Sequence, residues 1–211
     1  MEKNSRWMVL VILVVLILFI FAFYYVNKIT IPHTRSPIIN ISIGGSPYIG
    51  NSSAKIVIVD FSDFECPYCG KFFRGAFKDI NERYVKTGKA VFVYKNFPLE
   101  MHTHSRKAAE ASLCANEQGR FWDYHDKLFS NQDALTVNDL KIYARELSLD
   151  TNKFNDCLDS GKIGPIIENE IKEGKDYGVS GTPTIFINGI KIVGAQPFDI
   201  FKRTIEEELN K

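Results

Sequence analysis

FSDFECPYCGKFF, residues 61–73, places two cysteines three positions apart where an apolar run gives way to a helical pattern. Immediately before it, residues 56–59 (IVIV) form a β-branched run typical of a strand that is covered on both faces. After it, apolar residues recur at intervals of three and four up to Gly88, and this spacing predicts a helix. Its apolar stripe consists of Cys69, Phe72, Phe73, Ala76, Phe77, Ile80 and Tyr84. Cys66 is therefore expected at the first turn of that helix.

The remaining pattern predicts an α/β fold with a helical insertion. Residues 90–94 (AVFVY) form a second expected strand, so strand, helix and strand follow one another as in a parallel βαβ unit. From about residue 103 to 177 the apolar spacing is helical. Strands return at 184–187 and 190–193, joined by Asn188-Gly189, a pair favoured in tight hairpins. A last helix is expected to bury Phe198, Phe201, Ile205 and Leu209.

The placement of Cys66 predicts a reactive thiol. Unpaired backbone N–H groups and the positive end of the helix dipole favour a negative charge at a helix start. Cysteines in such positions have pKa values lowered from about 8.5 into a range of roughly 3.5 to 7.5. Cys69, one turn further on, is expected to lie within disulfide distance and to be shielded from solvent. The negative charges of Asp63 and Glu65 are expected to oppose the thiolate.

Other uses of a Cys-x-x-Cys pair are less well matched. Structural zinc sites usually have four ligands, and the chain has no second such pair. A purely structural disulfide across so short a loop restrains little unfolded-chain entropy. A binding module, either a metal carrier that uses Cys66 and Cys69 or a peptide-holding chaperone, stays open as an alternative. We expect no metal and no cofactor.

Three segments in order, FSDFECPYCG, CANEQGRFWDYHDKLF and GTPTIFING, resemble the DsbA-like thiol:disulfide oxidoreductases of the thioredoxin superfamily. The resemblance covers the chain from about Pro47 to its end. It implies a thioredoxin fold with the helical insertion at about residues 99–178. It also implies a cis peptide bond between Thr182 and Pro183, opposite Cys66, where backbone groups of Thr182 would pair with an extended substrate.

The same resemblance assigns roles to further residues. Asp60 is expected as a buried acid beneath Cys69, with which it would exchange protons. Pro67 and Tyr68, between the two cysteines, are expected to contact substrate together with Thr182 and Pro183. DsbA has histidine at the position of Tyr68, so one group that stabilises the thiolate is missing here.

The implied activity is the oxidation of dithiols in secreted or surface proteins. A substrate thiolate would attack Cys66 and form a mixed disulfide, and a DsbB-like or VKOR-like membrane protein would reoxidise the pair. The dipeptide Pro67-Tyr68 also occurs in glutaredoxins, so a reductase or isomerase of the same fold stays open.

Outside this pair, Cys114 and Cys157 both lie in the expected inserted helices. A structural disulfide between them is the favoured interpretation, and two buried free thiols are the alternative. His125 shares an apolar face with aromatic residues and is expected in the core. His102 and His104 are expected in a loop, without a catalytic role.

The amino-terminal segment predicts a membrane anchor. Residues 7–26 carry no charge, and as a helix they would cover about 30 Å, the thickness of a bilayer core. This apolar run is longer than that of a cleaved signal peptide, which is the alternative. We expect a single-pass signal anchor with a cytoplasmic amino terminus, a tether at residues 27–47 and an extracytoplasmic domain at 48–211. The formal net charge of +1 gives no reason to expect a nucleic-acid partner.

Overall fold

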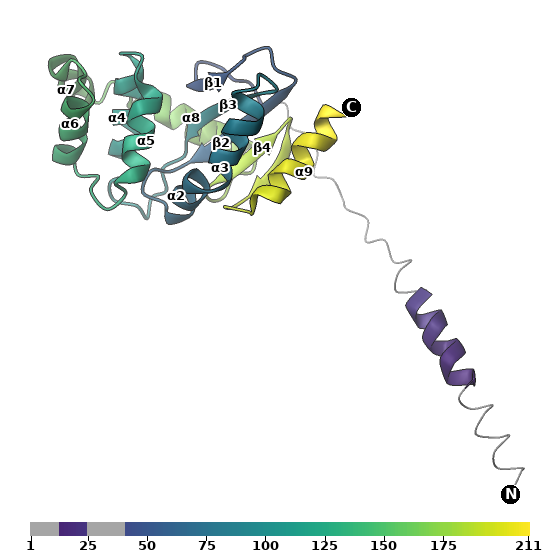
Figure 1. The fold of residues 1–211 in the computed structure, drawn as a ribbon. Coiled ribbons are helices and arrows are strands. Elements are labelled where there is room, and N and C mark those ends of the chain that lie inside the picture. Colours follow the sequence, from purple (N-terminus) through teal and green to yellow (C-terminus); the bar gives the residue numbers. More distant parts are fainter. Residues whose placement is uncertain (1–12, 25–40) are drawn as a thin grey trace, which may run out of the picture. The chain divides into compact units, whose positions relative to one another are not determined.

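The structure is a computed structural model that describes residues 13–24 and 41–211 (Figure 1). The chain divides into two units, Met1–Arg35 and Ser36–Lys211. In the first unit, residues 13–24 are helical and exposed. The predicted anchor extends past this helix at both ends, so residues 7–12 and 25–26 lie outside the described residues. Within the part of the chain that is described, no helix has the length and apolar character needed to cross a membrane.

The second unit is built on a five-stranded sheet with the order β1-β3-β2-β4-β5. The predicted parallel pair is present, because β2 and β3 run parallel, whereas β4 lies antiparallel on the other side of β2. Asn188 and Gly189 join β4 to β5 and both have positive φ, as a type I′ hairpin turn requires. The strands are β1 (Tyr48–Gly50), β2 (Ile56–Ser62), β3 (Ala90–Asn96), β4 (Thr184–Ile187) and β5 (Ile190–Val193).

Helices cover both faces of this sheet (Figure 1). On one face, alternate strand residues such as Ile58 and Phe92 pack against α2 (Pro67–Arg74), α3 (Ala76–Ile80) and α9 (Phe198–Leu209). On the other face, Val59 and its neighbours pack against Ile171 of α8 (Gly164–Asp176). Since successive strand residues point to opposite faces, a strand covered on both sides reads as the continuous apolar run seen in the sequence.

The predicted helical insertion lies between β3 and β4. Its buried residues form one core cluster that reaches from the insertion to Cys66 and Cys69. The inserted helices therefore pack directly behind Cys66 and Cys69. They are α4 (Ser105–Asn116), α5 (Phe121–Ser130), α6 (Val137–Glu146), α7 (Thr151–Ser160) and α8 (Gly164–Asp176).

Two features differ from the sequence expectation. The helix that begins after Cys66 is interrupted at Gly75, whose φ of −110° and ψ of −105° are not helical, and it continues as α3 and the π-helical turn η1 (Asn81–Val85). Residues 41–47, expected as the end of the tether, pack on the domain: Ile41 and Ile43 contact its core, and the Pro47 carbonyl accepts a hydrogen bond from Tyr94. They hold β1 against β3.

Candidate active site

The strand-to-helix turn after β2 positions both cysteines. Cys66 is the N-cap residue of α2, and Pro67 occupies the first helical position, where its missing N–H costs no hydrogen bond. Cys66 exposes 3% of its surface and Cys69 none, and both are free thiols. The shielding of Cys69 follows from its place one turn into the helix, on the face that packs against the core.

The pKa of Cys66 is strongly lowered. A hydrogen bond with the Cys69 side chain is the largest cause, and it brings the pKa of Cys66 to about 5 despite the opposing effect of burial. Hydrogen bonds from Thr182 and from the backbone N–H groups of Cys69 and Tyr68 contribute further. The direction agrees with the prediction from the helix start, although the neighbouring thiol contributes more than the helix backbone. At neutral pH Cys66 is a thiolate.

Cys69 has the opposite character. Burial raises its pKa, and the hydrogen bond to Cys66 and the charge of Asp60 add to the effect. The backbone N–H of Asp63 lies 3.5 Å from the Cys69 sulfur. The two sulfurs therefore differ in acidity, with Cys66 poised as the nucleophile and leaving group and Cys69 as the thiol that keeps its proton.

Asp60 lies in the middle of β2, opposite Tyr94 of β3 and Ile185 of β4. It is 3% exposed, and its Oδ1 atom has no hydrogen-bond partner among the described residues. Burial raises the pKa of Asp60 to about 8. A carboxyl with that pKa is mainly protonated at neutral pH and is suited to give or take a proton near Cys69.

Asp60→Asn is expected to remove a pH-dependent loss of stability. The pKa of Asp60 is about 8 in the folded protein, whereas an unfolded aspartate has a value of about 3.9. The folded state therefore holds a proton that the unfolded state releases between these values. The resulting stabilisation is complete below about pH 4 and is lost as the pH rises toward about 8. Asparagine has no such proton, so near pH 8 the variant should gain on the order of 2 to 5 kcal/mol in unfolding free energy.

This expectation is checked by urea unfolding of the reduced protein across the range from about pH 4 to pH 8. The gap between variant and wild type should widen as the pH rises. Asp199→Asn, at an exposed position in α9, serves as the control and should show no widening gap. Parallel curves for Asp60→Asn and wild type would contradict a raised pKa of Asp60.

The loop before β4 brings backbone groups to the nucleophile. The peptide bond between Thr182 and Pro183 is cis, and the Thr182 carbonyl lies 3.4 Å from the Cys66 sulfur. Tyr68 is 64% exposed beside the same sulfur-bearing turn. The structure thus places Asp60 within the central strand β2 and Cys66 and Cys69 in the turn and helix that follow it, with the Thr182 carbonyl near the Cys66 sulfur.

Sequence reasoning missed Gln132, in the connection between α5 and α6. Its side-chain amide donates hydrogen bonds to the carbonyl oxygens of Phe64 and Cys66, at 2.8 and 2.9 Å. An ideal Cβ at Gly70 would lie 1.9 Å from Gln132 Oε1, so a side chain at this position would displace the Gln132 amide from its place beside α2. Nothing in the local sequence marks Gln132, because its partners lie 66 and 68 residues away.

His102 lies in a loop, as expected, but its contact with Asp63 was not anticipated. Its Nδ1 atom lies 2.7 Å from Asp63 Oδ2. Asp63 begins the turn at residues 63–66 that leads from β2 to Cys66, which we call the redox turn. Glu65 is also engaged, since its Oε2 accepts the backbone N–H of His104 at 2.6 Å. The sequence places the residues that follow two parallel strands at the same end of a sheet, but it does not specify which of their side chains pair.

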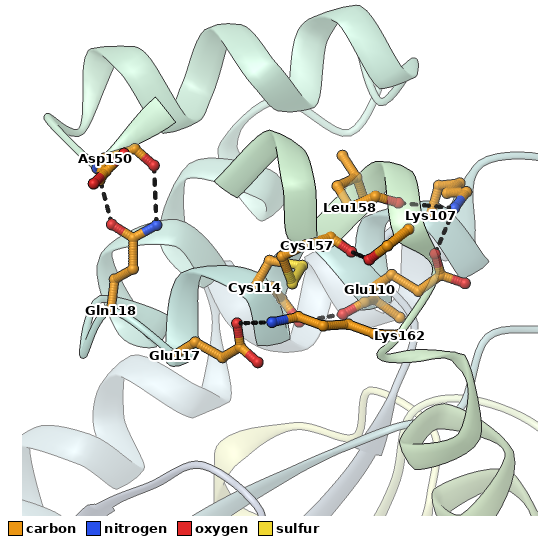
Figure 2. The surroundings of a disulfide bond; sticks show 12 residues. Lys107, Glu110, Cys114, Glu117, Gln118, Asp150, Cys157, Leu158 and Lys162 are labelled. Carbon is orange, nitrogen blue, oxygen red and sulfur yellow. Dashed lines mark hydrogen bonds and ion pairs between the residues drawn. A yellow bond between two sulfur atoms is a disulfide. The ribbon is translucent and has the colours of Figure 1, made fainter. Parts of the chain in front are cut away.

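The second cysteine pair forms a disulfide between α4 and α7 (Figure 2). The Cα atoms of Cys114 and Cys157 are 5.8 Å apart, and both residues are buried. His125 lies in the core, as expected, within a cage of aromatic rings. Among the described residues, no group of three or more His, Cys, Asp or Glu side chains is arranged to hold a metal ion.

Comparisons with known proteins agree with this geometry. A family model described as thioredoxin matches residues 42–207. Disulfide bond formation protein D of Bacillus subtilis is 29% identical over 181 residues, which cover 80% of this chain and 79% of that protein. The crystal structure of oxidised BdbD from Bacillus subtilis superposes with a TM-score of 0.76 and 29% identity, over 81% of this chain and 96% of that chain.

A higher identity occurs with longer proteins. The Na(+)/H(+) antiporter NhaA 3 of Salinispora tropica is 37% identical over 152 residues, which cover 72% of this chain but 22% of the antiporter. This chain therefore matches about a fifth of the length of such relatives. With the family model spanning most of the second unit, the chain belongs to the thioredoxin family, and its fold is similar to that of BdbD.

Proposed function

We propose that this chain is a thiol:disulfide oxidoreductase that works as a dithiol oxidase on reduced proteins outside the cytoplasm. The observation that carries the proposal is the contrast between the two cysteines of one helical turn. Hydrogen bonding lowers the pKa of Cys66 to about 5, whereas burial raises that of Cys69. A stabilised thiolate at Cys66 favours the reduced pair, and a pair that favours reduction oxidises its substrates.

In the first step a substrate thiolate attacks the sulfur of Cys66 in the Cys66–Cys69 disulfide. The bond between the two sulfurs breaks, Cys69 leaves with the electron pair, and a mixed disulfide joins the substrate to Cys66. The raised pKa of Asp60 makes this carboxyl a proton donor for the departing Cys69 sulfur. Cys69 thereby becomes a neutral thiol, which its apolar surroundings favour.

In the second step another substrate thiolate attacks the substrate sulfur of the mixed disulfide. Cys66 leaves as a thiolate, and the substrate departs with a new disulfide and two fewer electrons. The protein now holds those electrons as a dithiol. Its reoxidation requires a disulfide-donating partner, for which we propose a DsbB-like or VKOR-like membrane protein. No bound cofactor takes part.

Substrate is proposed to lie along the loop that faces Cys66. The Thr182 carbonyl, 3.4 Å from the Cys66 sulfur, is placed to pair with the backbone of an extended polypeptide. Exposed Tyr68 and Pro67 offer apolar contact to the residues that flank the substrate cysteine, whereas Pro183 is buried and acts through the backbone of the loop that it shares with Thr182. Such contacts bind the backbone and the apolar side chains of the substrate. They therefore suit many reduced proteins rather than one particular sequence.

The reduction potential tests the proposal against a reductase of the same fold. We expect the full-length protein in detergent, equilibrated in glutathione buffers, to have a potential between about −120 and −200 mV. In the same preparation it should oxidise a reduced, unfolded test protein. A potential near −270 mV, the value typical of thioredoxin, would instead indicate a reductant.

We further propose that residues 1–26 comprise a cytoplasmic tip and a single-pass anchor, followed by a tether to a domain at 48–211 that faces outward. The uncharged run at residues 7–26 supports the anchor. The disulfide between Cys114 and Cys157 supports an oxidising compartment. Release of the protein from membranes by an alkaline wash would argue against the anchor, and protection of the domain from protease in intact cells would argue against its orientation.

A further inference from the structure

Asp63, the first residue after β2, is held by three hydrogen bonds to its side chain. Its Oδ1 accepts the backbone N–H of Glu65 at 2.8 Å. Its Oδ2 accepts the backbone N–H of Leu99 at 2.9 Å and lies 2.7 Å from Nδ1 of His102. The Asp63 side chain has no exposed surface, so these donors stand in for water around its carboxylate. The loop after β3 is thereby fixed to the redox turn.

The backbone of Asp63 contacts both redox cysteines. Its carbonyl accepts the N–H of Cys66 at 3.1 Å, and its own N–H points to the sulfur of Cys69, 3.5 Å away. Whatever fixes the side chain of Asp63 therefore also fixes a donor aimed at Cys69. This donor matters because burial raises the pKa of Cys69, which makes its sulfur a poor leaving group unless charge on it is stabilised.

The imidazole of His102 also balances charge. A buried carboxylate next to two sulfurs would oppose the formation of either thiolate, as the sequence led us to expect of Asp63. Partial burial acts against protonation of His102, but the hydrogen bond and charge of Asp63 outweigh it and raise the pKa of His102, with Cys66 and Glu65 adding to the effect. The remaining charged side chains near His102 line an adjacent hollow of about 650 Å³: Glu100, Arg106, Glu168 and Lys175.

We propose that His102 is a positioning residue for thiol–disulfide exchange. Acting through Asp63, it holds the backbone N–H at the Cys69 sulfur and offsets the charge of the Asp63 carboxylate. When a substrate thiolate attacks Cys66 and the Cys66–Cys69 bond breaks, the electron pair passes to Cys69 beside this donor. The inference rests on the proposed function. It assigns to His102 the stabilisation of negative charge on the sulfurs of Cys66 and Cys69.

His102→Gln tests this role in the full-length protein in detergent. Glutamine keeps a hydrogen-bonding side chain but cannot carry the positive charge. We expect the pKa of Cys66, measured by the ultraviolet absorbance of its thiolate, to rise, the reduction potential to become more negative, and formation of the mixed disulfide to slow roughly threefold. His104→Gln is the matched control, because His104 is bonded to Glu65 through its backbone N–H, and this variant should behave like wild type.

The double variant Asp63→Asn with His102→Gln separates charge from packing and covers the case in which the single variant fails to fold. It removes the carboxylate together with the imidazole and leaves two amides that can pair. We expect it to fold and to restore the pKa of Cys66 and the exchange rate to wild-type values.

Two results would overturn the inference: His102→Gln that matches His104→Gln in pKa, potential and rate, or a folded double variant that exchanges as slowly as the single one. A wild-type protein that exchanges no disulfides at all would overturn the proposed function instead, so the two failures can be told apart.

Discussion

Cys66→Ser is expected to reduce the oxidation of a reduced test protein to the uncatalysed rate. Every step of the proposed exchange passes through the sulfur of Cys66, first as the atom attacked and then as the leaving group. A serine hydroxyl cannot form the disulfide, and its proton is not lost at neutral pH. The assay follows the loss of free thiols in the test protein while a glutathione buffer supplies oxidising equivalents.

Cys69→Ser gives the matched control at the other end of the pair. Cys66 can still attack a disulfide in this variant, but no second thiol is present to release the adduct. We expect a mixed disulfide between Cys66 and glutathione or substrate to accumulate and to be visible by mass spectrometry of the unreduced protein. Oxidase activity that survives in Cys66→Ser, or an adduct that forms on Cys114 or Cys157, would contradict the assignment of Cys66 as the nucleophile.

The elements whose apolar residues follow a regular spacing were predictable from the sequence. The β-branched run at β2, the paired signal at β4 and β5 with Asn188-Gly189, and the helical spacing of the insertion each reflect a local period, and each is present as predicted. The short strand β1 was not predictable, because three residues are too few to show alternation. The break at Gly75 was missed as well, since the apolar stripe continues across it.

The candidate site was likewise predictable only where it depends on a local sequence pattern. The direction of the Cys66 pKa shift and the burial of Cys69 could be argued from residues 61–73, although the largest cause of the shift is the hydrogen bond with Cys69 and not the helix start. The environment of Asp63 could not, because its partners Leu99 and His102 come from 36 and 39 residues further on. Its carboxylate looked like an uncompensated charge beside the thiolate, whereas the structure gives it three donors. Sequence patterns specify faces of elements, but they leave the pairing of loops at a sheet edge undetermined.

Replacing both Cys114 and Cys157 by alanine is expected to lower the free energy of unfolding by about 4 kcal/mol, the loop-closure entropy for a cross-link that spans 43 residues. The side chains are nearly wholly buried, so small cavities add to the loss. Urea unfolding of the unreduced proteins measures the effect. The matched control is the pairwise substitution of Cys66 and Cys69 by alanine, which should cost much less, because any cross-link between these two cysteines closes only a very short loop.

Polar contacts beside the disulfide also join the α4 region to the α7 region (Figure 2). Gln118 bonds the backbone of Asp150, and Lys107 bonds the carbonyl of Leu158, at distances from 2.9 to 3.3 Å. These polar contacts are largely exposed, and exposed pairs contribute little. The disulfide joins α4 to α7, whereas Cys66 and Cys69 belong to the start of α2, so the folded alanine variant should retain the exchange rate of wild type at low temperature. A folded variant that had lost exchange would show that the insertion does more than support the turn from behind.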